Sequence, residues 1–409
     1  MTTKKKRSFL IAIADLFNFK HSDPINLTGR YDPVFLILTF ALICFGLVML
    51  FSASFARAHY FKSNSLYFIS RQAIRAVIGL IGMFIIAKID YRKYKKFTLA
   101  AYIIGVILLA AVIVVGKPDE NGIKRWLSLG GPFQFQPSEI MKIALILTFA
   151  TLISKNYKKM KYFKYGVLNF VIILSVVIIL MLLEPHLSGT VLLCSIAGIM
   201  MFVGGTPVKW FVIVFSLAII ALLYIMFFKG NYMSGRTYIW LHPFTDPLNQ
   251  SMQTDQSLLA IGSGGLFGLG LGLSRQKFLY LPEVQNDFVF AVICEELGAV
   301  GAIAVIILFM CFCFKGFEIA LKVDDKFGSL MCTGIISQFI IQAIFNIAVV
   351  TSTIPNTGIS LPFFSYGGTA LVMQLWELGI VLNISKHCHT PKLIKLKTTN
   401  QTLTSKTLV

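Results

Sequence analysis

Long apolar runs constrain what this chain can fold into more than any other feature of its sequence. A run of about 20 apolar residues is long enough to cross a bilayer as a helix, and such runs recur along most of the chain. We therefore predict an all-α polytopic membrane protein with about ten transmembrane helices. The predicted spans lie near 33–53, 69–89, 98–116, 138–154, 165–183, 187–205, 208–228, 287–314, 327–352 and 362–384.

Composition and charge agree with this prediction. Only 13% of the 409 residues are charged, whereas a soluble domain has about 25%. The net charge is +19, and so basic a protein raises the question of a nucleic-acid partner. Here the basic residues gather in short segments between the apolar runs, as the positive-inside rule expects. The charge therefore indicates topology in a lipid bilayer and no nucleic-acid partner.

The basic segments also predict which connections share a side of the membrane. They alternate with connections poor in Lys and Arg, and an even number of spans places both termini on the basic, cytoplasmic side. The chain then divides into a cytoplasmic tail at 1–32, a membrane domain at 33–385 and a basic cytoplasmic tail at 386–409. The basic segments contain Lys4 to Arg7, Arg92 to Lys96, Lys155 to Lys164, Lys209, Lys315 to Lys326 and Lys386 to Lys397.

Three connections on the opposite, outer side stand out. Two of them are residues 117–137 and the tight turn at 184–186. The third, about 229–286, is far longer than a connection needs to be, and loops of that length are usually functional or disordered. Because this one is rich in Gly, aromatic and apolar residues, we expect short interfacial helices that lie on the membrane.

Two ionisable residues interrupt the fourth span. Pro137 suits the first turn of a helix, and Glu139 and Lys142 are three residues apart, so they share a face and can pair. Ionisable groups at membrane depth are costly and usually functional. Arg125 and Trp126 precede them in the outer connection. The alternative is a structural ion pair together with an Arg–Trp anchor at the membrane interface.

A carboxylate stands where the long outer connection enters the eighth span. A helix N-terminus favours the ionised form of Asp287, which could then accept a proton. Alternatively, Asn286 or Asp287 is the N-cap of this helix. Glu295 would lie about 80° round the helix from Asp287, and Glu296 nearly opposite. We expect Glu295 to share a cavity with Asp287, unless both glutamates pair with basic residues of neighbouring helices.

A glycine-rich run at 262–272 leads to Arg275 and Lys277. In a dinucleotide fold such a run lies between a strand and a helix, and that context is absent here. We expect instead a tight outer turn that presents two cations to a lipid-linked pyrophosphate, or simply to lipid headgroups. Further along, the small residues of 355–369 allow close helix packing.

These blocks, in this order, resemble the SEDS family (shape, elongation, division and sporulation), typified by RodA and FtsW. The resemblance covers about residues 33 to 385, and the run from Gly270 to Glu283 is similar to the FtsW and sporulation branch. The matching stretches are Arg125-Trp126, Gln136 to Glu139, Lys142, Gln253 to Gly272, Leu281 to Glu283, Asp287-Phe288, Glu295 to Gly298, Asn346 and Leu361 to Gly368.

The resemblance implies a ten-helix peptidoglycan glycosyltransferase of the bacterial cytoplasmic membrane. Such proteins polymerise lipid II on the outer leaflet beside a class B penicillin-binding protein, the transpeptidase, and other division or elongation proteins. The family's essential outer-loop carboxylate falls on Asp287, and its intramembrane pair falls on Glu139 and Lys142. The predicted substrate-binding residues are Arg125, Trp126, Gln136, Ser138, Glu139, Lys142, Arg236, Gln253, Arg275, Lys277, Glu283, Glu295 and Ser365.

The chain departs from the family pattern in two places. The family usually has His-Thr before the essential Asp, and Gln285-Asn286 stand there in this chain. The outer turn commonly reads Pro-Asp-x-Gly-Thr, whereas Pro185 to Thr190 is one residue longer and lacks the Asp. The roles of that His and that Asp therefore cannot be carried over.

The reaction implied by the resemblance joins two lipid II units. A sugar 4-hydroxyl attacks the anomeric carbon of the other unit, and the lipid pyrophosphate leaves without needing an acid. We assign Asp287 as the general base, with Arg125, Lys142, Arg275 and Lys277 as candidates to bind the pyrophosphate. Alternatively, a divalent cation, Mg²⁺ or Mn²⁺, binds the pyrophosphate and Asp287 is its ligand.

Two other functions fit parts of the sequence. A lipid II flippase or other transporter would share the intramembrane ionisable groups and the Pro and Gly near helix ends. It predicts internal repeats, and we find no convincing repeat. A non-catalytic scaffold of the cell-wall machinery would tolerate the loss of Asp287, and the departure at Gln285-Asn286 keeps that alternative open. The sequence favours the polymerase.

Overall fold

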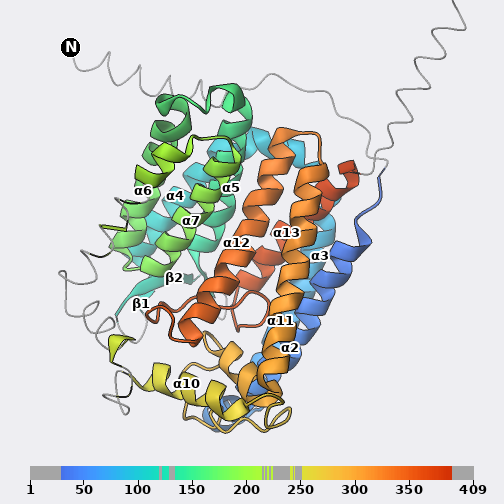
Figure 1. The fold of residues 1–409 in the computed structure, drawn as a ribbon, viewed down its shortest axis with the longest axis vertical. Coiled ribbons are helices and arrows are strands. Elements are labelled where there is room, and N and C mark those ends of the chain that lie inside the picture. The colour runs from blue at the N-terminus through green and yellow to red at the C-terminus, as the bar shows by residue number, and fades with distance from the viewer. Residues whose placement is uncertain are drawn as a thin grey trace, which may run out of the picture.

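The computed structural model describes residues 29–118, 122–128, 134–213, 216, 219–220, 223, 240–242, 244 and 251–388. Most of these residues form helices (Figure 1). The α-helices are α2 (Pro33–Lys62), α3 (Tyr67–Ile86), α4 (Thr98–Val115), α5 (Pro137–Asn156), α6 (Asn169–Leu183), α7 (Leu187–Val203), α10 (Met252–Gly264), α11 (Val289–Lys322), α12 (Lys326–Val350) and α13 (Ala370–Cys388). Three short 3-10 or π helices are η1 (Tyr91–Phe97), η2 (Tyr157–Lys159) and η3 (Lys164–Leu168).

The predicted multi-pass membrane fold is confirmed. Within the described residues, seven helical stretches are long and apolar enough to cross a membrane, and the apolar helix α7 has 17 residues. The predicted span at 208–228 lies partly outside the described residues, so the count of ten spans stays a prediction. The last span begins later than predicted, because residues 362–369 are not helical and α13 starts at Ala370.

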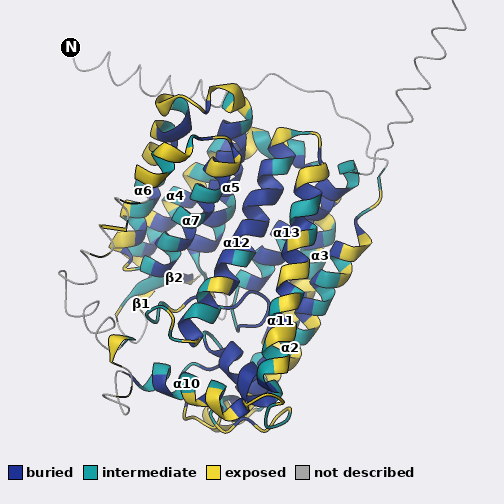
Figure 2. Ribbon diagram, in the orientation of Figure 1, coloured by how far each residue is buried: buried dark blue, intermediate teal, exposed yellow. Residues whose placement is uncertain are grey.

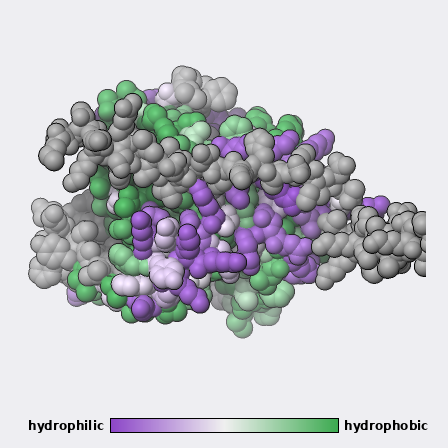
Figure 3. All heavy atoms as spheres, turned by 90° about the horizontal axis from the view of Figure 1, so that it is seen from above, coloured by the Kyte–Doolittle hydropathy of each residue, from purple (hydrophilic) through white to green (hydrophobic). Residues whose placement is uncertain are grey.

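The connections lie at two ends of the bundle. One end, here called the basic end, carries η1, the α5–α6 connection and the α11–α12 connection. Lys95 of η1 lies over the Phe327 ring at 5.3 Å, and Lys326 lies over the Tyr157 ring at 4.7 Å. Seen from this end, hydrophilic side chains gather across the face (Figure 3). The opposite end, here called the site end, carries the small sheet, the α6–α7 turn and residues 264–288.

The centre of the bundle is formed by α5 and α12. The apolar stretch of α5 is 83% buried inside the protein and that of α12 is 72% buried, against 22% for α3 (Figure 2). This position explains why α5 can carry Glu139 and Lys142, since both side chains face other helices and not lipid. The span with the most polar sequence is therefore the most enclosed one.

A three-stranded antiparallel sheet departs from the all-α prediction. Its order is β1 (Lys117–Pro118), β2 (Lys124–Ser128) and β3 (Gln134–Phe135). Strand β2 pairs with both neighbours, so the backbone groups of this outer connection bond to one another. The sheet places Arg125 and Trp126 at the site end of the bundle.

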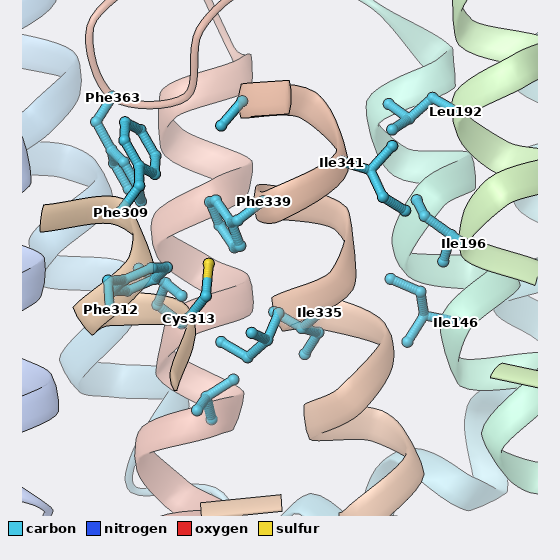
Figure 4. Close-up of a cluster of buried hydrophobic side chains, with 14 of the residues drawn as sticks. Ile146, Leu192, Ile196, Phe309, Phe312, Cys313, Ile335, Phe339, Ile341 and Phe363 are labelled. Atoms are coloured by element: carbon cyan, nitrogen blue, oxygen red, sulfur yellow. The ribbon is translucent and has the colours of Figure 1, made fainter. Parts of the chain in front are cut away.

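The connection between α12 and α13, residues 351–369, folds back into the bundle and is here called the inserted segment. Its Phe363 and Phe364 side chains are 2% and 0% exposed. The Phe363 ring stacks on that of Phe339 at 5.2 Å and meets Phe312 at 5.8 Å (Figure 4). These aromatic contacts join α11, α12 and the inserted segment. Residues 362–369 are therefore a packed non-helical segment, whereas a helix was predicted from Pro362 onward.

Helix α11 is broken near the site end. Gly298 has φ +67°, so the predicted eighth span consists of a short helical piece, 289–297, and a longer one that begins after the break. The turn residues that follow α10 bond into this break: the Leu269 N–H donates to the Glu295 carbonyl at 2.9 Å. Helix α10 itself lies across the ends of the long helices (Figure 1), as predicted for a short helix in the 229–286 connection.

We predict that Gly298→Ala destabilises the protein, whereas Gly262→Ala does not. A Cβ at Gly298 would lie 2.3 Å from the Gly268 nitrogen. Its backbone, at φ +67° and ψ −167°, is in a region almost restricted to glycine, which costs another residue about 1–3 kcal/mol before any clash is counted. A Cβ at Gly262, in helix α10, meets nothing within 4 Å and should stabilise by about 0.4–1 kcal/mol. Thermal unfolding in detergent compares the two variants, and equal unfolding temperatures would contradict the prediction.

Candidate functional site

A polar cavity of about 70 Å³ opens between helices α5, α7 and α12 near the site end. Part of its wall is the backbone of the inserted segment at Gly358, Ile359 and Ser360. The lining residues are Gln136, Ser138, Glu139, Lys142, His186, Ser188, Gly189, Leu192, Leu193, Gln342, Gly358, Ile359 and Ser360. Four of the predicted substrate-binding residues therefore come together in this cavity.

The ion pair of α5 is one wall of the cavity. Lys142 Nζ lies 2.7 Å from Glu139 Oε2, with side chains 3% and 11% exposed, which confirms the predicted pairing. Pro137 is in the first turn of α5, and Gln136 is the residue before the helix. Glu139 therefore lies in the first turn, where the helix dipole favours a negative charge, and Lys142 follows one turn deeper in the cavity.

Asp287 lies next to the part of the cavity wall that the inserted segment forms. Helix α11 begins at Val289, and Phe288 occupies the N-cap position without a side-chain hydrogen bond, so neither Asn286 nor Asp287 is the N-cap. A Cβ added to Gly358 would lie 3.3 Å from Asp287 Oδ2. The carboxylate of Asp287 therefore adjoins the segment that lines the cavity.

A single amide holds Asp287 against this wall. Asn346 of α12 is fully buried, and its Nδ2 donates both to the Asp287 carbonyl and to the Ile359 carbonyl, each at 2.7 Å. One side chain thus fixes the backbone of the catalytic candidate and the backbone of the cavity wall relative to each other. The cavity wall at Ile359 and the backbone of Asp287 are therefore held in one geometry.

Glu283 supports the turn that carries Asp287. Its carboxylate lies 2.5 Å from Arg57 of α2 and accepts a hydrogen bond from Asn286 Nδ2, also at 2.5 Å. Its carbonyl accepts from the Asp287 N–H at 3.3 Å. Gln285 Nε2 donates to the same carboxylate at 3.2 Å. The structure therefore places Glu283, a predicted substrate contact, in the support of the turn, and Gln285-Asn286 belong to this support.

A separate, buried network contains Lys277, Glu295 and Glu296. Lys277 Nζ donates to Glu296 at 2.8 Å, to Ser52 at 3.2 Å and to a backbone carbonyl at 2.7 Å. Glu295, fully buried, accepts from the Ser274 hydroxyl and from backbone N–H groups of the loop. Lys277 and Glu295, both predicted to contact substrate, therefore hold the loop to α2 and α11, and the structure does not bring them to the cavity.

The remaining predicted residues lie around the site end. Arg125 Nη2 donates to the Pro185 carbonyl at 2.8 Å, and Trp126 packs near Gly368 of the inserted segment. Arg275 is exposed. Ser365 accepts the Leu361 N–H at 2.8 Å and Gln253 accepts from Asn356 at 2.7 Å, so both brace the inserted segment. Arg236 lies outside the described residues.

The sequence analysis missed two kinds of site residue. Asn346 belonged to the family resemblance but was given no role, because its two acceptors are 59 and 13 residues away along the chain. His186 lines the cavity from the α6–α7 turn, and Gln342 lines it from α12. The departure of the α6–α7 turn from the family pattern was the one sequence signal that pointed to His186.

The α6–α7 turn carries two titratable groups next to the cavity. Burial raises the pKa of Glu184 to about 8, although Arg125 acts to lower it. Burial lowers the pKa of His186 to about 3, and the positive charges of Arg125 and Lys142 act in the same direction. Near neutral pH, His186 is therefore an uncharged imidazole at the cavity wall.

The described residues around the cavity do not form a metal site by themselves. Within the described ranges, no group of three or more His, Cys, Asp or Glu side chains is placed to hold a metal ion. Mg²⁺ is often bound by one or two carboxylates together with substrate phosphates. The alternative of Asp287 as a ligand of Mg²⁺ or Mn²⁺ would need that kind of shared coordination, and it stays a prediction.

Comparisons with known proteins place this chain in one family. The FtsW, RodA and SpoVE family, described as "Cell cycle protein", matches residues 33–390. Stage V sporulation protein E of Bacillus subtilis is 38% identical over 357 residues, which are 87% of this chain and 97% of that protein. A probable peptidoglycan glycosyltransferase FtsW of Geobacter metallireducens is 36% identical over 359 residues, 87% of this chain and 95% of that one.

Solved structures share the fold. A structure described as "Structural coordination of polymerization and crosslinking by a peptidoglycan synthase complex" matches with a TM-score of 0.73 and 26% identity, covering 88% of this chain and 99% of that chain. The rod shape determining protein RodA of Thermus thermophilus matches with a TM-score of 0.65 and 27% identity, covering 88% and 98%.

We predict that stability falls as pH rises from 6.5 to 8, and that Glu184→Gln reduces this fall. A carboxyl whose folded pKa is raised binds more protons in the folded than in the unfolded state between 4.5 and about 8, so folding weakens as pH rises through that window. His186 acts with the opposite sign, and only between about 3 and 6.5.

Thermal unfolding at pH 6.5 and pH 8 measures the effect, because only Glu184 of these two groups titrates in that window. His186→Asn is the matched comparison and should keep the fall. A wild-type unfolding temperature that does not fall between the two pH values would contradict the assignment.

Proposed function

Because this chain belongs to the FtsW, RodA and SpoVE family, we propose that it is a peptidoglycan glycosyltransferase that polymerises lipid II into glycan strands. The single observation that carries this proposal is the position of Asp287. Its carboxylate adjoins Gly358, which lines a polar cavity that contains a buried cation, Lys142, and Asn346 holds the backbone of Asp287 at this place. A base beside a cationic pocket is what glycosyl transfer from a pyrophosphate requires.

We propose that the basic end of the bundle faces the cytoplasm and the site end faces outward. The α5–α6 connection supports this orientation, since it has five lysines between 155 and 164, and no acidic residue occurs from 140 to 183. Lys and Arg in short connections mark the cytoplasmic side. The described chain starts and ends at the basic end, where Lys315 of α11 lies 3.0 Å from Asp32 before α2, so both termini are cytoplasmic in this proposal.

The chemistry follows from the cavity. The 4-hydroxyl of one lipid II sugar attacks the anomeric carbon of the other, and Asp287 takes the hydroxyl proton. A new glycosidic bond forms, the bond to the pyrophosphate breaks, and the lipid pyrophosphate leaves as an anion. Lys142 is the cation best placed to stabilise that charge, since it is buried in the cavity wall, with Arg125 beside the neighbouring turn.

We propose a class B penicillin-binding protein as the partner that cross-links the product, together with other division or elongation membrane proteins. The match to a structure described as a peptidoglycan synthase complex that coordinates polymerization and crosslinking supports this. The relatives named FtsW and stage V sporulation protein E favour a role in division or sporulation.

We predict that Asp287→Asn lowers the rate of glycan polymerisation by about 10²–10⁴-fold, the usual effect of removing a general base. The measurement is the yield of glycan strands from lipid II, on a gel, with the partner protein present. Asp324→Asn is the matched control, because Asp324 is exposed at the basic end, and it should leave the rate unchanged. If Asp287→Asn polymerises as fast as the wild type, Asp287 is not the base. If the wild type makes no polymer beside an active control enzyme, lipid II transport or a scaffold role replaces the polymerase.

The metal alternative has its own test. If Asp287 acts as a base without a metal ion, polymerisation by the wild type continues in excess chelator. Loss of activity in chelator, restored by Mg²⁺ or Mn²⁺, would assign Asp287 to a shared metal site with the pyrophosphate.

A further inference from the structure

Helix α3 carries two arginines at membrane depth. Arg71 and Arg75 are four residues apart and share a face, and Arg71 is exposed while Arg75 is half-buried. Their neighbours Ile74 and Ile78 are 60% and 49% exposed. An apolar face of this kind on a membrane helix borders lipid, so the two guanidinium groups lie at the boundary between protein and bilayer.

Neither arginine has a carboxylate partner among the described residues. Arg71 lies over the Tyr67 ring at 4.1 Å, and Arg75 lies over the Tyr366 ring at 5.1 Å. The Nη1 of Arg75 is buried and has no hydrogen-bond acceptor in the part of the chain that the structure describes. Leaving a buried charged donor without an acceptor costs free energy. The buried Arg75 donor is therefore left without an acceptor among the described residues, and a bound anion would supply one.

The direction of α3 decides where that acceptor lies. Tyr67, the first residue of α3, is at the site end, and Arg75 is eight residues further, about 12 Å along the axis. Side chains on a helix tilt toward its N-terminus, and long arginine side chains extend toward the nearer membrane surface. Both guanidinium groups therefore reach toward the headgroup level of the leaflet at the site end. The planar donor fork of arginine matches a phosphate there.

This arginine pair is separate from the cavity but connected to Asp287. No residue of α3 lines the cavity. The Tyr366 N–H, however, donates to the Gln285 carbonyl at 2.7 Å, two residues before Asp287. Gln72 Nε2 also bonds the Ser365 carbonyl at 3.2 Å, which fixes α3 to the inserted segment. A ligand held by the arginines is therefore tied to the turn that positions the catalytic carboxylate.

We propose that Arg71 and Arg75 bind the pyrophosphate of a second lipid-linked substrate, and that Lys142 in the cavity serves the first. This rests on the proposed function, since joining two lipid-linked sugars requires two lipid-pyrophosphate sites. Their reducing ends would lie on different faces of the inserted segment, and Asp287 would lie between the two substrates.

The test measures lipid binding and not turnover. Native mass spectrometry of the full chain in zwitterionic nanodiscs, titrated with undecaprenyl pyrophosphate, counts the molecules bound. We expect two bound molecules for the wild type, one for R71Q/R75Q and one for Lys142→Gln. The affinity of the lost site should fall about tenfold or more, as expected when a hydrogen bond to a charged group is removed. K88Q/K93Q removes the same charge at the basic end and should change nothing.

Each outcome decides the proposal. Unchanged binding of undecaprenyl pyrophosphate to R71Q/R75Q overturns it. A loss confined to phosphatidylglycerol, tested in parallel, also overturns it, because the arginines would then hold an ordinary phospholipid. Arg75→Lys keeps the charge but not the donor fork, and partial loss with this variant supports the proposal even if the double variant folds poorly. A wild type that binds two molecules without polymerising them would refute the proposed function and not this site.

Discussion

Inside a membrane, a backbone that leaves the helical conformation must find its hydrogen bonds within the protein. Part of the site of this protein is built from such backbone, namely the inserted segment and the turn before α11. The side-chain amide of Asn346 donates hydrogen bonds to two such backbone groups, the carbonyls of Asp287 and Ile359. Ser365 and Gln72 satisfy further groups of the inserted segment. The geometry of the candidate site therefore depends on side chains that bond the backbone around it.

The same constraint explains how the buried charges are used. Lys277 and Glu296 form an ion pair with side chains 3% and 0% exposed, and a serine and a backbone carbonyl complete it. A buried ion is tolerated when it is fully hydrogen-bonded, and this pair fastens the long outer connection to α2 and α11. Glu139 and Lys142 are also buried and paired, but their pair borders a cavity. The Glu139–Lys142 pair is a candidate functional pair because it lines a cavity, whereas the Lys277–Glu296 pair is structural.

Two groups of polar residues lie near one carboxylate. The cavity lies between α5, α7 and α12, the arginine pair lies on α3, and Asp287 stands just before α11. The inserted segment contacts Asp287 through Gly358, Arg75 through Tyr366 and Asn346 through Ile359. A glycosyl transfer between two large lipid-linked substrates needs this separation, because both substrates must approach the same base from different directions.

The sequence determined the features that depend on neighbouring residues. The apolar runs of α2 to α6 are local, since about 20 such residues span a bilayer wherever they occur. The Glu139–Lys142 pair is local too, because three residues separate them on one helix face. The family resemblance added Asp287, through a pattern spread along the chain.

Only the tertiary structure decided the roles of Glu295, Lys277, Glu283 and Asn346. The angular argument for Glu295 assumed a helix that continues through Asp287, whereas α11 begins at Val289. The contacts of the other three join residues 225, 226 and 59 positions apart. Helical periodicity carries information over a few turns, so a contact made by chain reversal and packing lies beyond it.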